Sequence, residues 1–312
     1  MPRRVAVERW PLREPFTIAR GAKTEAVVVV VELSADGCVG RGEAVPYARY
    51  GEDPASVVAA IESGGSLRGA AAAAVDAATI DLERARAGER AWEWLGLDAP
   101  APVPILFTIP IRDPDTTRAM AAREHRRPIL KLKLGGDDDL ARVRAARQGS
   151  PDARLIVDCN EGWDLATLER LAPPLAELGV ELIEQPIPAA DDAALDGWDG
   201  PIPLCADEGF VGDASGLDAL VGRYAAVNVK LDKAGGLRPA IACLRRARAL
   251  GLRVMVGSMV ATSLAVAPAV LLAQSADWAD LDAPLYLARD REPGLRFDDD
   301  SRVHPPPDGL WG

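Results

Sequence analysis

Five charged residues recur along the middle of the chain at nearly equal spacing. Lys133, Asp158, Glu184, Asp207 and Lys230 are separated by steps of 25, 26, 23 and 23 residues, and each ends a short run rich in apolar residues. Three carboxylates brought together would repel one another strongly unless a cation lay among them. Oxygen ligands without Cys or His favour a hard ion. The pattern therefore predicts one Mg²⁺ per subunit, held by Asp158, Glu184 and Asp207.

The lysines on either side of these carboxylates are candidates for proton transfer. Lys131 and Lys133 point to the same face of one predicted strand, so the charge of Lys131 is expected to lower the pKa of Lys133 towards the range of a useful base. Lys230 ends a run four strands further around an eight-strand ring, which places it opposite Lys133. A lysine on each face of a substrate suits removal and return of a proton.

Neighbouring polar residues are candidates for support of this site. Asn160, Glu161 and Glu208 lie next to the predicted ligands, although each could equally be a helix cap or a surface group. Asp232 is a candidate for orienting Lys230, whereas Lys233 is expected at the surface.

Other chemistries are disfavoured by what the chain contains. The histidines, His125 and His304, lie in a charged run and a Pro-rich tail, where solvated surface positions are expected. Ser-His-Asp and Cys-His mechanisms are therefore disfavoured. The four cysteines form no C-x-x-C pair and suit a reducing compartment. Taken alone, Asp158, Glu184 or Asp207 could each be a helix N-cap. Only their combination favours a metal site.

The elements that position these residues follow from the same spacing. A step of about 25 residues accommodates one strand, one helix and two short loops, which predicts parallel strands. Eight apolar runs follow this pattern, at residues 103–109, 128–134, 154–158, 180–184, 202–207, 226–230, 252–257 and 278–282. Eight units favour a (β/α) barrel, whose catalytic residues sit at the carboxyl ends of its strands. A doubly wound open sheet is the rival fold, but no G-x-G-x-x-G turn supports it.

The first hundred residues have a different texture. Extended stretches at 4–10, 26–32 and 38–45, with a turn at 34–37, predict a strand meander. Residues 55–61 and the alanine-rich 67–87 are typical of helices, and Gly88 is a predicted stop. An α+β unit is therefore expected before the barrel.

Composition limits the partners. The formal net charge of −11 leaves no basic surplus for nucleic acid or an anionic membrane surface. Neither a signal peptide nor an apolar stretch long enough to span a bilayer is recognisable. The sequence thus predicts a cytoplasmic enzyme, possible as a homo-oligomer, that acts on a small molecule.

The motifs together resemble the enolase superfamily, and within it the muconate-lactonizing group, which has K-x-K on its second strand and K-x-D on its sixth. The resemblance covers nearly the whole chain. It implies an α/β fold with a (β/α)7β modified TIM barrel at residues 99–289. It also implies an α+β capping domain at 1–98, completed by about 290–312.

More narrowly, several stretches resemble dipeptide epimerases of the L-Ala-D/L-Glu type. These are residues 10–21, 46–52, 203–208, 227–237 and 280–284. The resemblance implies that Asp280 and Asp282 hold the free α-ammonium of a dipeptide and that Arg20 faces the side-chain carboxylate of a C-terminal Glu. Ser258 and Lys131 are further candidates for substrate binding.

The implied reaction is inversion of the α-carbon of the C-terminal residue by two-base proton transfer through an enediolate, with Lys133 and Lys230 as the bases. A related lyase or cycloisomerase such as o-succinylbenzoate synthase would use the same lysines without needing Asp280 and Asp282. A Schiff-base aldolase acting through Lys230 is an alternative from a different class.

Overall fold

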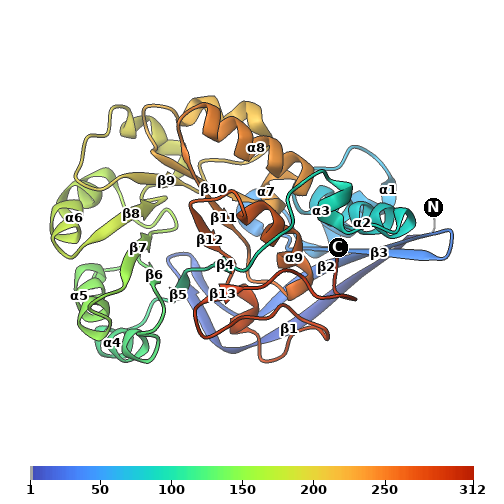
Figure 1. Ribbon diagram of the computed structural model, residues 1–312. Helices are drawn as coiled ribbons and strands as arrows, with labels where there is room; N and C mark the ends of the chain where they lie inside the picture. The colour runs from blue at the N-terminus through green and yellow to red at the C-terminus, as the bar shows by residue number, and fades with distance from the viewer. Residues whose placement is uncertain (1–2) are drawn as a thin grey trace.

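The N-terminal part of the chain folds as the expected α+β unit. The computed structural model describes residues 3–312 (Figure 1), and its first sheet is antiparallel, in the order β1 (Arg3–Ile18), β2 (Gly21–Ala35), β3 (Cys38–Ala44). Helices η1 (Ala48–Tyr50), α1 (Pro54–Ser63), α2 (Gly69–Ala87) and α3 (Ala91–Trp94) follow. Gly88 ends α2 in the left-handed conformation, so its prediction as a stop is confirmed.

The apolar run of β2 is continuous because both faces of this strand are buried. Val28 and Val30 belong to the large hydrophobic core shared with the barrel, whereas Val29 and Val31 pack into a second core with α1 and α2. Side chains alternate between the faces of a strand, so the sheet is a layer between two hydrophobic cores.

Within residues 3–312 the second part of the chain forms an eight-stranded parallel sheet in strictly sequential order. Its strands are β5 (Phe107–Ile109), β6 (Ile129–Lys133), β7 (Arg154–Asp158), β8 (Val180–Glu184), β9 (Leu204–Ala206), β10 (Ala226–Lys230), β11 (Arg253–Gly257) and β12 (Trp278–Asp280). A backbone hydrogen bond of 3.0 Å from Leu106 to Ala279 joins the two ends of the sheet. The predicted barrel is confirmed, and sequential order excludes the doubly wound rival.

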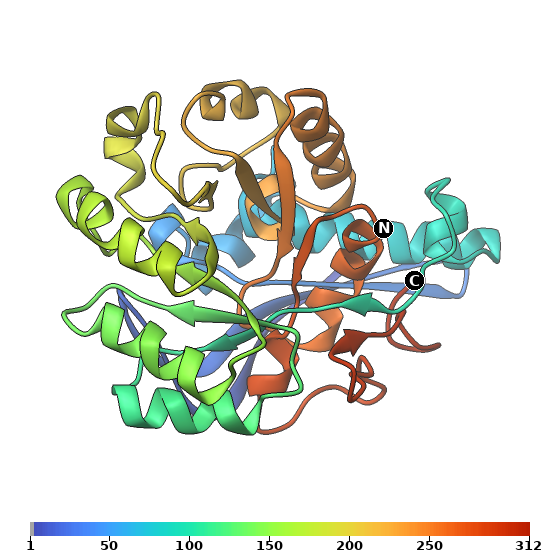
Figure 2. The same ribbon diagram turned by 60° about the vertical axis from the view of Figure 1, so that its left-hand side comes forward.

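The connections between strands differ in length. Helices α4 (Pro114–Arg123), α5 (Asp139–Gly149), α6 (Leu165–Glu177), α8 (Leu237–Ala249) and α9 (Ser263–Ala273) are regular, and several lie outside the ring of strands (Figure 2). By contrast, the crossovers after β8 and β9 contain the 3₁₀ segments η2 (Ala189–Leu195) and η3 (Ala214–Leu220). Asp, Gly and Pro are frequent around η2, and these residues favour turns over a long helix.

The first predicted barrel strand is divided in two. β4 (Val103–Pro104) pairs antiparallel with β13 (Arg302–Val303) of the C-terminal segment, and only β5 belongs to the barrel sheet. The C-terminal segment then returns to the N-terminal unit, where the Trp311 indole donates to the carbonyl of Ala77 on α2. This contact supports the proposed domain division, in which the last residues complete the capping domain.

Eight apolar side chains fill the barrel on the side where its strands begin, which is called the lower end here. They form one buried cluster with a member from each strand or from the residue just before it: Leu106, Ile129, Ile156, Leu182, Cys205, Ala226, Met255 and Trp278. Two residues further along, the side chains must again point inward. Those positions hold Thr108, Lys131, Asp158, Glu184, Asp207, Asn228, Gly257 and Asp280. An apolar layer thus lies directly below a polar one.

No helix among residues 3–312 is long and apolar enough to cross a membrane.

Candidate active site

The three predicted metal ligands converge in the polar layer of the barrel. Asp158 and Glu184 are fully buried and Asp207 is 1% exposed. One carboxylate oxygen from each lies within 4.8 Å of the others. They are brought together because they end, or directly follow, three adjacent strands, β7, β8 and β9.

Lys133 and Lys230 reach this cluster from two sides. The Lys133 ammonium lies 2.5 Å from Asp158 Oδ2, and that of Lys230 lies 2.7 Å from Asp207 Oδ2. β6 and β10, which carry the two lysines, flank the three strands of the carboxylates. Each lysine therefore approaches a different carboxylate at opposite edges of the cluster.

Lys131 has a different environment from the one expected. It is fully buried, and its Nζ lies 2.7 Å from Glu184 Oε2, 2.7 Å from Asp280 Oδ2 and 3.1 Å from Asp158 Oδ2. Burial opposes its charge, but these three carboxylates raise the pKa of Lys131 well above its usual value. Its charge is thus balanced by acidic groups, and it links the carboxylate cluster to Asp280.

Lys233 is not at the surface, so that prediction was wrong. Its side chain is fully buried, and the ammonium donates to Asp207 Oδ1 at 2.6 Å, the Asp207 carbonyl at 2.5 Å and the Asn228 carbonyl at 3.0 Å. Lys233 lies on α7 (Leu231–Ala234), a single turn directly after Lys230. This turn brings the Lys233 side chain back to Asp207. The charged residues of K-L-D-K gave no sign of this burial.

The carboxylates differ in protonation tendency. Burial alone would raise the pKa of Asp158, but Lys133 and Lys131 hold it below its usual value. Burial likewise opposes the charge of Asp207, yet Lys230 and Lys233 hold its pKa well below normal. For Glu184, burial raises the pKa to about 7, with a further contribution from the negative charge of Asp158.

The cluster fits a hard divalent cation. All three ligands offer oxygen atoms, and Glu184 Oε2 is a buried oxygen that receives no hydrogen bond, although it is in ion contact with Lys131. Three buried carboxylates around one point also repel one another, and a divalent cation among them relieves that repulsion. Asp158, Glu184 and Asp207 are therefore the residues that would hold Mg²⁺.

Asp280 and Asp282 form a second acidic pair across the barrel mouth. Asp282 Oδ2 accepts from the backbone N–H of Thr108 at 2.6 Å and from the Tyr286 hydroxyl, while Asp280 contacts Lys131. Burial, together with the charge of Asp280, raises the pKa of Asp282 to about 6. A cationic ligand between them would relieve this repulsion.

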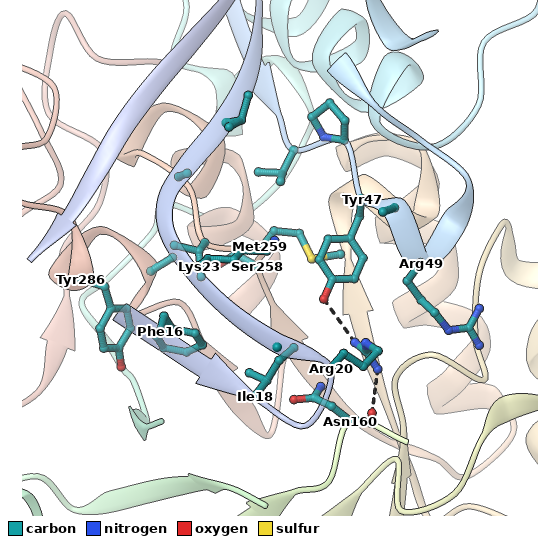
Figure 3. Close-up of a pocket in the computed structure, with 18 of the residues that line it drawn as sticks. Phe16, Ile18, Arg20, Lys23, Tyr47, Arg49, Asn160, Ser258, Met259 and Tyr286 are labelled. Atoms are coloured by element: carbon teal, nitrogen blue, oxygen red, sulfur yellow. Dashed lines mark hydrogen bonds between the residues drawn. The ribbon is translucent and has the colours of Figure 1, made fainter. Parts of the chain in front are cut away.

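The cavity of about 770 Å³ above the polar layer is roofed by the capping domain. Figure 3 shows Arg20, Lys23 and Tyr47 of the capping domain around it. Arg20 is held within the protein: its guanidinium donates to Glu208 at 2.5 Å, to the Asn160 carbonyl at 2.7 Å and to the Tyr47 hydroxyl at 3.2 Å. Arg20 lines the cavity and its charge is paired with Glu208, so its expected contact with a substrate carboxylate stays a prediction.

Lys23 is a cation of this cavity that sequence reasoning missed. Its ammonium lies 4.4 Å from the centre of the Tyr47 ring and, among residues 3–312, has no acidic partner within 4 Å. Burial lowers the pKa of Lys23 to about 8, and the charges of Arg20 and Lys230 contribute. A single lysine on an otherwise regular strand carries no distinguishing sequence signal.

The remaining predicted residues have these positions. Asn160 donates to Glu208 at 3.3 Å, Glu161 pairs with Arg49 and Arg20, and the Ser258 hydroxyl faces the Asp280 carbonyl at 3.5 Å. Asp232 accepts from the backbone N–H of Val45 at 2.7 Å, so it connects the barrel to the capping domain instead of orienting Lys230.

Comparisons with known proteins agree with this geometry. Residues 115–309 match the family described as enolase C-terminal domain-like, and residues 3–64 match the mandelate racemase / muconate lactonizing enzyme N-terminal domain. The chain is 43% identical to the L-Ala-D/L-Glu epimerase of Escherichia coli K12, over 94% of this chain and 97% of that one.

Two solved structures are informative. An enolase family member from Agrobacterium tumefaciens with homology to dipeptide epimerases, solved with sodium and L-Ala-L-Glu, is 43% identical, with a TM-score of 0.95 and full coverage of both chains. A dipeptide epimerase from Enterococcus faecalis, solved with Mg and L-Leu-L-Tyr, is 26% identical, with a TM-score of 0.89 and coverage of 97% and 96%.

Proposed function

Because the chain belongs to the enolase superfamily, in its mandelate racemase and muconate lactonizing enzyme group, we propose that it is a Mg²⁺-dependent dipeptide epimerase. The reaction inverts the α-carbon of the C-terminal residue. The observation that carries the proposal is the pair of lysines, Lys133 and Lys230, that reach one carboxylate cluster from opposite edges.

The two lysines divide the proton transfer between them. For one stereoisomer, the neutral amine of one lysine removes the α-proton, and the ammonium of the other returns a proton to the opposite face. For the other stereoisomer the roles are exchanged. Both Nζ atoms contact oxygens of the metal ligands. Each lysine therefore already points to the place where a substrate carboxylate would meet the cation.

A bound Mg²⁺ would supply positive charge next to the substrate carboxylate, where negative charge accumulates as the α-proton leaves. The chain itself contributes a roof over part of the cavity. Arg49 and Arg20 of the capping loops pair with Glu161 of the barrel, which holds the loops over the cavity and limits the access of water.

Two further groups of residues favour a dipeptide. Asp280 and Asp282 are suited to the α-ammonium of the first residue because their mutual repulsion is relieved by a cation. At the other side of the cavity Arg20 and Lys23 provide positive charge, which suits an anionic C-terminal residue such as Glu. A lyase such as o-succinylbenzoate synthase would have no use for the acidic pair.

The proposal is tested by following α-protons by NMR in D₂O with Mg²⁺ and a small dipeptide library. Exchange and inversion at the C-terminal residue, abolished by chelator and restored by Mg²⁺, are expected. Activity that is indifferent to chelator would contradict the metal assignment. Turnover of o-succinylbenzoate precursors without dipeptide exchange would favour the lyase, and borohydride trapping of Lys230 with a carbonyl substrate would favour the aldolase.

We also propose that the protein is cytoplasmic and that it self-associates. All four cysteines are free thiols, three of them buried, which suits the reducing cytoplasm. Self-association as a homo-oligomer is a prediction that size-exclusion chromatography with light scattering would check.

A further inference from the structure

Each of the three metal-ligating carboxylates has one oxygen held by a fixed donor. Asp158 Oδ1 accepts from the backbone N–H of Asn160 at 2.9 Å. Glu184 Oε1 accepts from the Asn228 amide at 2.8 Å. Asp207 Oδ1 accepts from Lys233 at 2.6 Å. The same division of the two oxygens is therefore repeated on three successive strands.

The second oxygen of each carboxylate faces a lysine ammonium. Asp158 Oδ2 contacts Lys133 and Lys131, Glu184 Oε2 contacts Lys131, and Asp207 Oδ2 contacts Lys230. These second oxygens lie on the side of the cluster that the lysines of the site approach. They are the oxygens that a cation can share without disturbing the fixed donors.

Lys233 is unlike the other lysines of the site. An ammonium has three N–H donors, and the three acceptors of Lys233 are one carboxylate oxygen and two backbone carbonyls, all buried. No donor is left for a ligand, and the side chain is fully buried. Lys233 therefore cannot exchange protons with a substrate. Its contacts hold only Asp207 and the backbone of Asn228.

The Asn228 side chain has room beside the neighbouring strand. Gly257 lies beside it on β11, and a Cβ at Gly257 would lie 2.5 Å from Asn228 Oδ1. The absence of a side chain at 257 gives the Asn228 amide the room to reach Glu184. Lys233 also donates to the Asn228 carbonyl, so the two donors form one connected support.

We propose that Lys233 and Asn228 are positioning residues that restrict Asp207 and Glu184 to one metal-facing oxygen each and thereby select a small octahedral cation over a larger one. The inference rests on the proposed function only through its Mg²⁺ site. Ca²⁺ takes six to eight oxygens and readily uses both oxygens of a carboxylate, whereas Mg²⁺ requires near-octahedral geometry with single oxygens and water. Outer hydrogen bonds that orient ligands commonly change metal affinity by about 10- to 100-fold.

The test measures Mg²⁺ and Ca²⁺ binding by isothermal titration calorimetry without substrate, for the wild type and for Lys233→Met and Asn228→Leu. Both variants are expected to bind Mg²⁺ about 10- to 100-fold more weakly, with a smaller loss for Ca²⁺. Charge alone predicts the opposite for Lys233→Met, because removing a cation near the site would strengthen cation binding. Unchanged or tighter Mg²⁺ binding by the folded variant would overturn the proposal.

Lys23→Met is the matched control, because it removes a lysine charge from the cavity without touching the carboxylates; its Mg²⁺ affinity should not fall. Circular dichroism of the metal-free proteins checks folding. Should Lys233→Met not fold, the neutral replacement Asn228→Leu decides the matter alone: weaker Mg²⁺ binding supports the proposal, and unchanged binding contradicts it. A wild type that binds no Mg²⁺ would refute the proposed function itself.

Discussion

At the scale of single residues, the site is a balance of buried charges. Lysine ammonium groups and carboxylates contact one another with almost no exposure to water, where interactions between charges are much stronger than at a surface. Removing one partner leaves the other uncompensated. When a charged residue of the site is replaced, the loss of its chemical role must therefore be distinguished from the effect of leaving its partner's charge uncompensated.

The two proposed bases give a distinctive prediction. Lys133→Ala and Lys230→Ala should each reduce epimerisation by roughly 100-fold or more, the usual scale of general acid-base catalysis. Each variant should still exchange the α-proton of one stereoisomer in D₂O, because one base remains, and the two variants should prefer opposite stereoisomers. NMR of each pure isomer checks this. Full epimerisation by both variants would disprove the two-base assignment.

The acidic pair gives a prediction about binding. In Asp282→Asn the side-chain oxygen still accepts from Thr108 and Tyr286, but the charge that faces a substrate ammonium is lost. Since a hydrogen bond to a charged group contributes about 1.5 to 3 kcal/mol, KM for free dipeptides should rise by roughly 10- to 100-fold. An N-acetylated analogue, which has no ammonium, is the control. An equal loss for both substrates would argue against this role.

At the scale of elements, close packing in the capping domain depends on missing side chains. A Cβ at Gly40 would lie 2.2 Å from the backbone N of Leu82, and one at Gly42 would lie 2.1 Å from the Ala74 carbonyl. Strand β3 and the alanine-rich helix α2 therefore touch through their backbones. The position of α2 follows from glycine on one side and alanine on the other.

Gly42→Val should consequently destabilise the protein by about 1 to 3 kcal/mol or more, because the clash is with helix backbone that cannot rotate away. Val39→Ala, at a half-exposed position of the same strand, should have little effect. Chemical denaturation of both variants provides the comparison. Equal stability of Gly42→Val and the wild type would show that α2 can move aside at little cost.

At the scale of the whole molecule, buried polar contacts connect the capping domain to the barrel. Glu43 on β3 accepts from Thr262 of the barrel and from Arg291 of the C-terminal segment, and Asp232 accepts from Val45. Val45 leads into the loop that carries Tyr47 and Arg49, so these contacts determine how the roof lies over the site.

Asp232 gives a pH prediction. Burial raises its pKa from 3.8 to about 6, against the effect of the Val45 N–H. A raised carboxylate pKa means that the folded state binds the proton more tightly than the unfolded chain does. The contribution of this proton to the free energy of unfolding is complete below the pKa of Asp232 in the unfolded chain, and it is lost as the pH rises through about 6. Asp232→Asn keeps an acceptor without this loss. Its stability relative to the wild type should increase by about 1 kcal/mol between pH 5 and pH 8.

Urea denaturation at both pH values measures this difference. Glu83→Gln on the solvent side of α2 is a control in which no such change is expected. A constant difference between Asp232→Asn and the wild type across this range would show that Asp232 does not titrate as its burial requires.

Much of the architecture was predictable because it is local. The spacing of Lys133, Asp158, Glu184 and Lys230 reflects one strand and one crossover per unit. The period of the apolar residues and the turn residues between them indicate each strand and crossover directly. Strand-end carboxylates without Cys or His similarly indicate a hard cation. The irregular crossovers after β8 and β9 and the division of the first strand depend on pairing with distant segments, so local pattern did not predict them.

The barrel, the capping unit and the residues that could bind metal and move protons were thus recognisable from spacing and residue type. Which charges neutralise one another depended on the folded arrangement. Lys233 had the pattern of a surface residue but is buried against Asp207, and Arg20 pairs with Glu208. Lys23, by contrast, has no acidic partner within 4 Å in the part of the chain that the structure describes. The physical reason is that charge balance depends on distances of a few ångströms between side chains far apart in the chain, which spacing along one strand cannot specify.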